Sequence, residues 1–364
     1  MSGVVAVVGA GNVGCALAGD LALRGAEVRL FNRSGARLAP IREAGGITVT
    51  GEVEGFAELS LITERLLDAV HGADVVAVTL PTSSLPSYAP ALAAATTEEQ
   101  VIWLDPGHSG GALYLAAAIA RATGGGGRKL CQLTTASHIS RMTGPAAVRV
   151  FLLSRASVAA LPRSDLDECY ERVSALLPGQ LDKIDSVLEA DLANINAVMH
   201  PPGMVCNAGW IEATEGGFGF YADGNGPAVA RVMDAVDRER LALAERLEVP
   251  TAPLAELLHR FGFTAEALRT AGVYEAIKGS ELIHPIKAPP TLDHRYLHED
   301  IGWGLVPWMH LAAAVASPAP VIRAITDLAG VINGIDYART GLTIDGMGLT
   351  GKTADEIRAY AGGP

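Results

Sequence analysis

The first residues whose types and spacing could do chemistry are three glycines near the amino terminus. Gly9, Gly11 and Gly14 form the pattern G-x-G-x-x-G, directly after the apolar run Val4–Val8. Between a strand and a helix, the first glycine permits a tight turn, the second lets the backbone approach a pyrophosphate and the third allows close packing. The free N–H groups of the following helix would face the phosphates. The pattern predicts a dinucleotide site formed by Gly9, Gly11, Asn12, Val13 and Gly14.

A second strand, Glu27–Phe31, ends where the adenosine ribose should lie and is followed by Asn32, Arg33 and Ser34. An acidic residue here would bind the ribose 2′-OH of NAD(H), whereas an arginine between small polar groups favours the 2′-phosphate of NADP(H). We predict NADP(H), with NAD(H) as the alternative in which Arg33 merely stacks on the adenine. FAD, S-adenosylmethionine or a tight turn without a ligand are the other interpretations of the glycine pattern.

A second group of polar residues lies in the later half of the chain. Asn196 and His200 are four residues apart, so on a helix they share one face. Pro201 and Pro202 should disturb or end that helix, which would leave His200 at a break. Asp300, far along the chain, precedes an apolar helical run and could be a helix N-cap. His200 and Asp300 could also form a general acid/base pair, or His200 could be a packed histidine bonded to a carbonyl.

Alternating strand and helix patterns place the glycine turn in an α/β domain. Short apolar strands between helices are typical of a parallel sheet covered on both faces, here a doubly wound Rossmann fold. Pro81 and Thr82 follow the third strand, at the edge where a nicotinamide should bind. The expected strands are Val4–Val8, Glu27–Phe31, Val75–Leu80, Val101–Leu104 and Arg149–Leu153. The expected helices are Asn12–Arg24, Arg37–Ala44, Ser84–Ala95, Gly110–Thr123 and Asp165–Leu177.

The pattern changes near residue 185, after which helical periods dominate. In 229–247, apolar residues recur on one helix face, and the apolar stretch 312–329 is interrupted by Pro318 and Pro320. We therefore predict a dinucleotide-binding domain over residues 1–184 and an all-helical substrate domain over 185–364. The apolar C-terminal helices could also form the surface of a homodimer.

Composition excludes several classes of partner. The 364 residues carry a formal net charge of -12 without a Lys/Arg cluster, which argues against nucleic acid and anionic membranes. No apolar run has the length and uniformity of a membrane span. The four cysteines have neither C-x-x-C nor zinc-ligand spacing, so we predict no metal. Reduced thiols and the absence of a signal-peptide pattern predict a cytoplasmic protein.

Several stretches together resemble the octopine/nopaline dehydrogenase family nearly end to end. They are the glycine turn, residues 105–113 (DPGHSGGAL), residues 194–201 (NINAVMHP) with Asn207, and residues 295–307 with the pattern Arg-Tyr…Glu-Asp…Gly-Leu-Val-Pro. The glycine turn is generic, but the asparagine–histidine–proline and Glu-Asp…Gly-Leu-Val-Pro stretches are specific.

The resemblance implies a helical C-terminal domain, substrate bound between domains and a catalytic His–Asp pair at His200 and Asp300. It also places Asn196 among polar active-site residues, and Arg141 near a family arginine. Asn207 belongs to the same stretch. A substrate with two carboxylates needs a cationic partner, and Arg141 is our candidate. The family's acidic residue after the second strand is missing here, so its NAD(H) preference does not carry over.

The implied reaction joins a 2-keto acid to an amino acid or amine and reduces the resulting imine by hydride transfer. A ketopantoate reductase or glycerol-3-phosphate dehydrogenase has the same fold plan, but it should use a lysine near the carbonyl. An imine reductase acting on a preformed imine would use the same His–Asp pair. A non-catalytic dinucleotide sensor is the alternative outside the enzymes.

Overall fold

The computed structural model describes residues 3–125 and 127–362, which form two compact units. The first unit is Met1–Gly107 with Gly111–Ala190, and the second is His108–Gly110 with Asp191–Pro364. The division between Ala190 and Asp191 falls within helix α7 (Val187–Leu192), a few residues after the boundary expected at 184/185. The short segment 108–110 joins the second unit, where Asn194 Nδ2 donates to Ser109 Oγ at 3.2 Å.

The first unit is built on a sheet of eight strands in the order β12-β11-β8-β7-β6-β1-β2-β5. Six neighbouring strands of this sheet run parallel: β8, β7, β6, β1, β2 and β5. Strand β11 is antiparallel to β8, so the sheet is mixed at one edge and not wholly parallel as expected. Strands β2 and β5 lie on one side of β1, and β6, β7 and β8 lie on the other, so the strand order reverses between β1 and β6. The strands are β1 Val4–Val8, β2 Glu27–Phe31, β5 Leu61–Thr63, β6 Val75–Val78, β7 Val101–Leu104, β8 Lys129–Leu133, β11 Ala156–Leu161 and β12 Leu181–Lys183.

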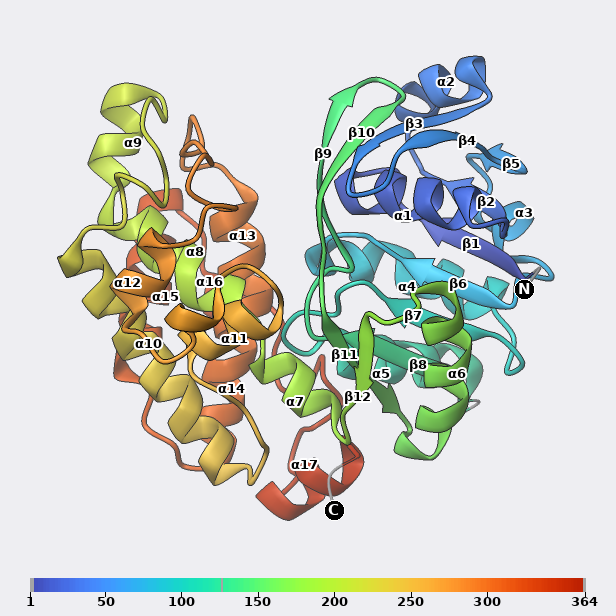
Figure 1. Cartoon of the computed structure of the whole chain (residues 1–364). Coiled ribbons are helices and arrows are strands. Elements are labelled where there is room, and N and C mark those ends of the chain that lie inside the picture. Colours follow the sequence, from blue (N-terminus) through green and yellow to red (C-terminus); the bar gives the residue numbers. More distant parts are fainter. Residues whose placement is uncertain (1–2, 126, 363–364) are drawn as a thin grey trace. The chain divides into compact units, whose positions relative to one another are not determined.

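A second, four-stranded sheet in the same unit was not predicted. Its order is β4-β3-β10-β9, and the predicted late strand 149–153 belongs to it as part of β10. Figure 1 shows the long β9 and β10 strands beside helix α1 (Asn12–Leu23), with which both make contacts. The sheet escaped prediction because its strands contain glycine and polar residues. The strands are β3 Gly46–Gly51, β4 Gly55–Glu58, β9 His138–Gly144 and β10 Ala147–Leu153.

Helices cover the main sheet and pack their apolar faces on it. Buried side chains such as Leu17 and Leu21 of α1 and Trp103 of β7 belong to one core cluster. The predicted helices of this unit are present with similar bounds: α1 Asn12–Leu23, α2 Gly35–Ala44, α4 Leu85–Ala95, α5 Gly111–Thr123 and α6 Leu166–Leu176. The unit also contains elements that were not predicted: α3 Leu66–Val70, α7 and the short turns η1 Thr82–Ser84 and η2 Arg163–Asp165.

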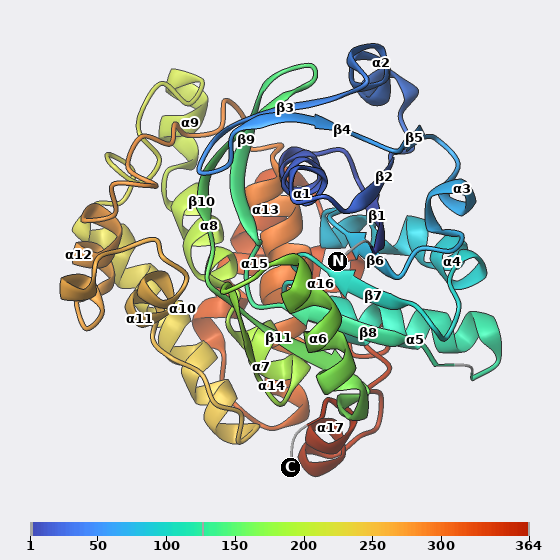
Figure 2. The ribbon, with the colours of Figure 1, turned by 45° about the vertical axis from the view of Figure 1, so that its right-hand side comes forward.

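The second unit is helical apart from one isolated bridge between Gly219 and Lys287 in its described residues. Helix α8 is almost fully buried and contacts α10, α13 and α15 (Figure 2). The expected break in the apolar tail is present, since α14 ends before Pro318 and α15 begins at Pro320. The elements are α8 Ile195–Cys206, α9 Ala208–Thr214, α10 Pro227–Arg246, α11 Leu254–Arg260, η3 Glu266–Leu268, α12 Val273–Lys278, α13 Arg295–Asp300, η4 Ile301–Leu305, α14 Val306–Ala314, α15 Pro320–Asn333, α16 Tyr337–Thr340 and α17 Ala354–Tyr360.

Across residues 3–125 and 127–362, none of the helices combines the length and apolar character that crossing a membrane requires.

Candidate active site

The second unit brings His200 and Asp300 together. His200 Nδ1 lies 2.7 Å from Asp300 Oδ2, although 100 residues separate them. Both groups are buried, with relative exposures of 6% for His200 and 1% for Asp300. The second carboxylate oxygen, Oδ1, is also buried and has no hydrogen-bond partner among the described residues. An ionised Asp300 would accept a hydrogen bond from Nδ1–H, which would fix the tautomer of the ring and stabilise the imidazolium.

His200 does not lie at a helix break, so this part of the prediction was wrong. Helix α8 continues through Pro201 and Pro202 to Cys206. Each proline lacks an N–H donor and removes one i→i−4 hydrogen bond, which normally ends or kinks a helix. Here the packing of a nearly fully buried helix against its neighbours outweighs that loss. His200 is therefore held by a rigid, packed helix and not by a loop.

Asp300 does stand at a helix N-cap position, directly before Ile301–Leu305. It is the last residue of α13, and its side chain makes no capping hydrogen bond. The next turn, Ile301–Leu305, is a π-helix, in which the helix widens by one residue. A π-turn of this kind shifts the residues around it relative to a regular helix, and such turns often occur at functional sites.

Three aromatic rings surround the imidazole. Tyr296 of α13 stacks on it with ring centroids 3.6 Å apart, and Phe220 meets it edge-on at 6.2 Å. The Tyr221 hydroxyl lies 2.8 Å from His200 Nε2. Sequence reasoning missed Phe220 and Tyr221. The aromatic cluster between Gly217 and Gly224 was the available signal, because large rings between glycines have no helical or strand period.

An arginine on α13 was also missed. Arg295 lies five residues before Asp300, and its side chain is 53% exposed while pairing at 2.8 Å with buried Glu299. The Glu299 carboxylate raises the pKa of Arg295 above its usual range, although burial acts in the opposite direction. His108 Nε2 lies 3.8 Å from the same carboxylate. The helix that carries Asp300 therefore also presents a guanidinium.

Asn196 and Asn207 occupy opposite ends of α8. Asn196 is in the first turn, and its backbone N–H donates to the N-cap side chain of Asn194. Its own side chain is half-buried. Asn207 caps the carboxyl end, where its Nδ2 donates to Gly203 O at 2.8 Å and to Gly224 O at 3.0 Å. Asn207 thus joins the end of α8 to the glycine-rich loop.

In the first unit, the glycine turn has the geometry that the pattern requires. Gly9 adopts φ +118°, a region open to glycine, and its N–H donates to Phe31 O. A Cβ on Gly14 would lie 1.8 Å from Gly9 O, whereas a Cβ on Gly11 would meet nothing within 4 Å. Gly14 is therefore a packing glycine, and the space beside Gly11 suits a pyrophosphate at the start of α1. Asn12 Oδ1 accepts from Met142 N at 2.9 Å, which ties β9 to this turn.

The three residues after β2 lie at the same carboxyl edge. Asn32 Oδ1 accepts a hydrogen bond from Ala10 N in the glycine turn. Arg33 and Ser34 are exposed, and the Arg33 guanidinium carbon lies 5.4 Å from the centre of the Tyr88 ring. Ser34 is the N-cap residue of α2, and its side chain makes no capping hydrogen bond. An exposed guanidinium beside a helix N-terminus is a suitable site for a phosphate group.

The other predicted residues of this unit occupy different places. Pro81 is exposed and Thr82 buried at the start of η1, directly after β6 and next to the reversal point of the sheet. Arg141 is exposed on β9, one residue before Met142, which binds Asn12. Because successive strand residues point to opposite faces, Arg141 and Met142 face different sides of β9.

A buried polar chain in the first unit was not predicted. Asp105 Oδ2 lies 2.5 Å from Ser137 Oγ, which lies 2.7 Å from His138 Nδ1, and His138 Nε2 lies 3.1 Å from Asp20 Oδ2. Burial raises the pKa of Asp105. Burial would also raise the pKa of Asp20, but hydrogen bonds from His138 and Arg24 outweigh it and lower that pKa. The chain links the end of β7 to α1.

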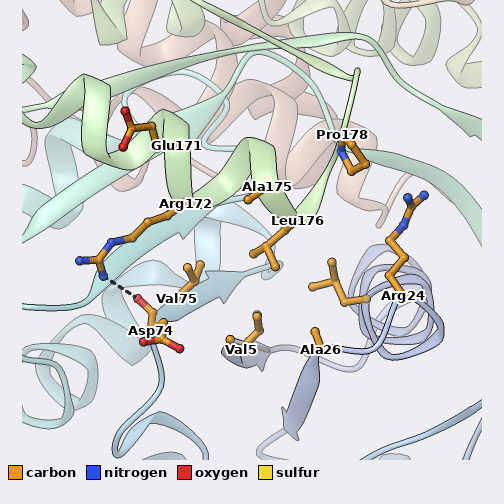
Figure 3. A pocket seen from close by; sticks show the side chains of 12 residues that line it. Val5, Arg24, Ala26, Asp74, Val75, Glu171, Arg172, Ala175, Leu176 and Pro178 are labelled. Atoms are coloured by element: carbon orange, nitrogen blue, oxygen red, sulfur yellow. Dashed lines mark hydrogen bonds between the residues drawn. The ribbon is translucent and has the colours of Figure 1, made fainter. Parts of the chain in front are cut away.

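A cavity of about 470 Å³ lies in the first unit at the opposite edge of the sheet, by the amino ends of β1 and β6 (Figure 3). Its floor is apolar, with Val5, Val75 and Leu176. Two of its charged side chains make hydrogen bonds within the unit, since Asp74 Oδ2 accepts from Val4 N and Arg172 donates to the Asp74 carbonyl. Ligands of doubly wound sheets bind at the carboxyl ends of the strands, so this cavity is not the candidate active site.

Comparison with known proteins agrees with this architecture. The family described as NAD/NADP octopine/nopaline dehydrogenase, alpha-helical domain, matches residues 183–333, and ketopantoate reductase PanE/ApbA matches residues 5–109. An opine dehydrogenase of Arthrobacter sp. (strain 1C) is 33% identical over 356 residues, which is 97% of each chain. An octopine dehydrogenase structure with NADH and L-arginine is 20% identical, covers 98% of this chain and 97% of its own, and has a TM-score of 0.75. An NADP+-bound yersinopine dehydrogenase structure is 16% identical, covers 99% of this chain and 98% of its own, and has a TM-score of 0.76.

The Rossmann sheet with its glycine turn, followed by this helical domain, defines a nicotinamide-dependent oxidoreductase. The chain belongs to the octopine/nopaline dehydrogenase family, as the resemblance in the sequence implied. It is thus an NAD(P)-dependent enzyme acting on CH–NH donors, which condenses a keto acid with an amino acid or amine and reduces the product. The match to ketopantoate reductases reflects the shared first domain and ends at residue 109.

Proposed function

We propose that His200 is the general acid/base of this reductive condensation. Asp300 orients the imidazole ring and stabilises its protonated form. The observation that carries the proposal is the buried 2.7 Å contact between His200 Nδ1 and Asp300 Oδ2. Imine formation and reduction require a proton near the reacting carbon and nitrogen, and imidazole exchanges protons near neutral pH. A positioned acid/base of this kind contributes on the order of 10²–10⁴ in rate.

We propose that the substrate is a 2-keto acid together with the amine of a second molecule. Two carboxylates on such a product call for cationic and amide partners. Arg141 remains our candidate for one carboxylate, since its guanidinium is exposed, and Asn196 for a hydrogen bond. Arg295 is a second guanidinium candidate, because it is half exposed and lies on the same helix as Asp300. Asn207 supports the end of α8, since its amide hydrogens bind two carbonyls.

For the cofactor, we propose NADP(H). The exposed Arg33 guanidinium, the start of α2 and the absence of an acidic side chain at 32–34 support a phosphate on the adenosine ribose. Arg33→Asp should therefore shift the ratio of kcat/KM values toward NAD(H), whereas Arg42→Asp, at the far end of α2, should leave it unaltered. An unchanged ratio in Arg33→Asp would remove Arg33 from phosphate recognition.

The substrates are best found by a screen of keto acid and amine pairs. Oxidation of NADPH would be followed by absorbance, and each product would be identified by mass. A product with the summed mass of both substrates, less one oxygen atom, supports reductive condensation. Reduction of the keto acid alone to a hydroxy acid, with no amine incorporated for any pair, would contradict the proposal.

We also propose a cytoplasmic, homodimeric protein. The four cysteines are free thiols, which suits a reducing compartment. On α15, the apolar side chains of Leu328 and Val331 are 52% and 82% exposed. An exposed apolar pair on a helix surface favours contact with a second copy of this chain. Light scattering of the purified protein should give twice the chain mass, and Val331→Glu should give the mass of one chain. A monomer in the unmodified protein would refute this arrangement.

A further inference from the structure

The described structure leaves neither ring nitrogen of His200 directly open to a substrate. Asp300 Oδ2 lies 2.7 Å from Nδ1, and the Tyr221 hydroxyl oxygen lies 2.8 Å from Nε2. His200 itself is 6% exposed. A proton leaving Nε2 must therefore pass to the Tyr221 oxygen, unless Tyr221 moves away.

Tyr221 is firmly held on both sides in the chain. Phe220 N donates to Ile286 O, and the Phe220 ring lies edge-on to that of Tyr221 at 5.0 Å. On the other side, Lys278 Nζ donates to the carbonyl of Ala222. Tyr221 is 3% exposed. A side chain fixed in this way suits a permanent hydrogen-bond partner better than a gate that opens.

We propose that Tyr221 carries the proton between His200 and the substrate; this rests on the proposed role of His200. A phenol hydroxyl both donates and accepts, so it can take a proton from Nε2–H as it gives its own away. When neutral, His200 accepts the Tyr221 proton at Nε2, and when protonated it donates to the Tyr221 oxygen. The same hydrogen bond therefore serves both directions of the reaction.

The transfer balances for the condensation step. Addition of the amine to the keto carbon gives a carbinolamine, whose hydroxyl must leave as water. Tyr221 O–H donates its proton to that hydroxyl while Nε2–H of protonated His200 donates to the Tyr221 oxygen. The C–O bond breaks, the nitrogen lone pair forms C=N, and water leaves. A bound dinucleotide would supply the hydride that reduces the iminium ion to the secondary amine, and Tyr221 would remain intact with His200 neutral.

Tyr221→Phe tests the relay, because phenylalanine keeps the ring and its packing and removes only the hydroxyl. We expect kcat to fall by about 10² or more while KM stays within a few-fold. Tyr337→Phe is the matched control, since the Tyr337 hydroxyl also binds a histidine, at 2.8 Å from His298 Nδ1 in the same unit. It should retain the kcat of the unmodified enzyme.

A second variant keeps the test decisive if Tyr221→Phe misfolds. Incorporation of 3,5-difluorotyrosine at position 221 preserves the hydroxyl and makes it more acidic. A relay predicts that the alkaline limb of the kcat–pH profile moves to lower pH, whereas a purely structural hydroxyl would leave the profile in place. Tyr221→Phe with unmodified kcat, beside an inactive His200→Ala, overturns the relay alone. Full activity in both variants overturns the proposed role of His200 as well.

Discussion

Replacement of Asp300 by asparagine tests the electrostatic part of the proposed mechanism. The amide fits the space of a carboxylate that is 1% exposed, but it removes the negative charge 2.7 Å from Nδ1. Opposite charges about 4 Å apart attract by about 4 kcal/mol at an effective dielectric constant of about 20. Because about 1.4 kcal/mol corresponds to a factor of ten in rate, we expect Asp300→Asn to lower kcat by about 10³.

The assay is steady-state oxidation of NADPH with a keto acid and amine pair, together with a fluorescence titration of NADPH binding. The dissociation constant for NADPH should stay within a few-fold, because the glycine turn belongs to the other unit. Asp293→Asn is the control, since Asp293 also binds a histidine at 2.7 Å but is 92% exposed. That variant should keep the unmodified kcat. A kcat for Asp300→Asn within about tenfold of the unmodified enzyme would refute the reasoning.

Further predictions concern stability. Asp237→Ala leaves the fully buried Arg240 guanidinium without its carboxylate, and chemical denaturation should show a loss of about 3–5 kcal/mol. Asp234→Ala, on the exposed side of the same helix, should cost less than about 1 kcal/mol; equal losses would contradict this account. The pKa of Asp20 is lowered in the folded protein because hydrogen bonds from His138 and an arginine outweigh the effect of burial. Its ionisation therefore stabilises the fold above about pH 4, and melting temperatures of Asp20→Asn and the unmodified protein should converge as pH falls below that value. A constant difference across this range would count against the bond to Asp20.

The parts of the fold that sequence reasoning identified are those with local signals. The glycine turn follows a short apolar strand, and each requirement of that turn is met by one residue, such as the positive φ of Gly9. The strands β1, β2 and β7 match their predicted bounds because apolar runs end at glycine, polar or proline residues. The four-stranded sheet was missed because strands such as Gly55–Glu58 gain their stability from pairing and not from their composition.

In the candidate site, spacing placed Asn196 and His200 on one helix, and the family resemblance joined His200 to Asp300. Local rules failed at Pro201, since tertiary packing of α8 overrides the cost of a proline in the helix. The aromatic cluster around Tyr221 was visible in the sequence, but its role was not, because the position of the hydroxyl at Nε2 depends on a loop whose conformation is set by distant contacts, such as that with Ile286.

The central claim is that His200 supplies and removes the proton of a reductive condensation. The most direct test is a mixture of keto acid, amine and NADPH deuterated at the transferred position, with mass analysis of the product. The unmodified enzyme should yield a secondary amine that contains a single deuterium. His200→Ala should bind NADPH equally well but form that product at least about 10² more slowly. Undiminished formation of the deuterated amine by His200→Ala would contradict the account.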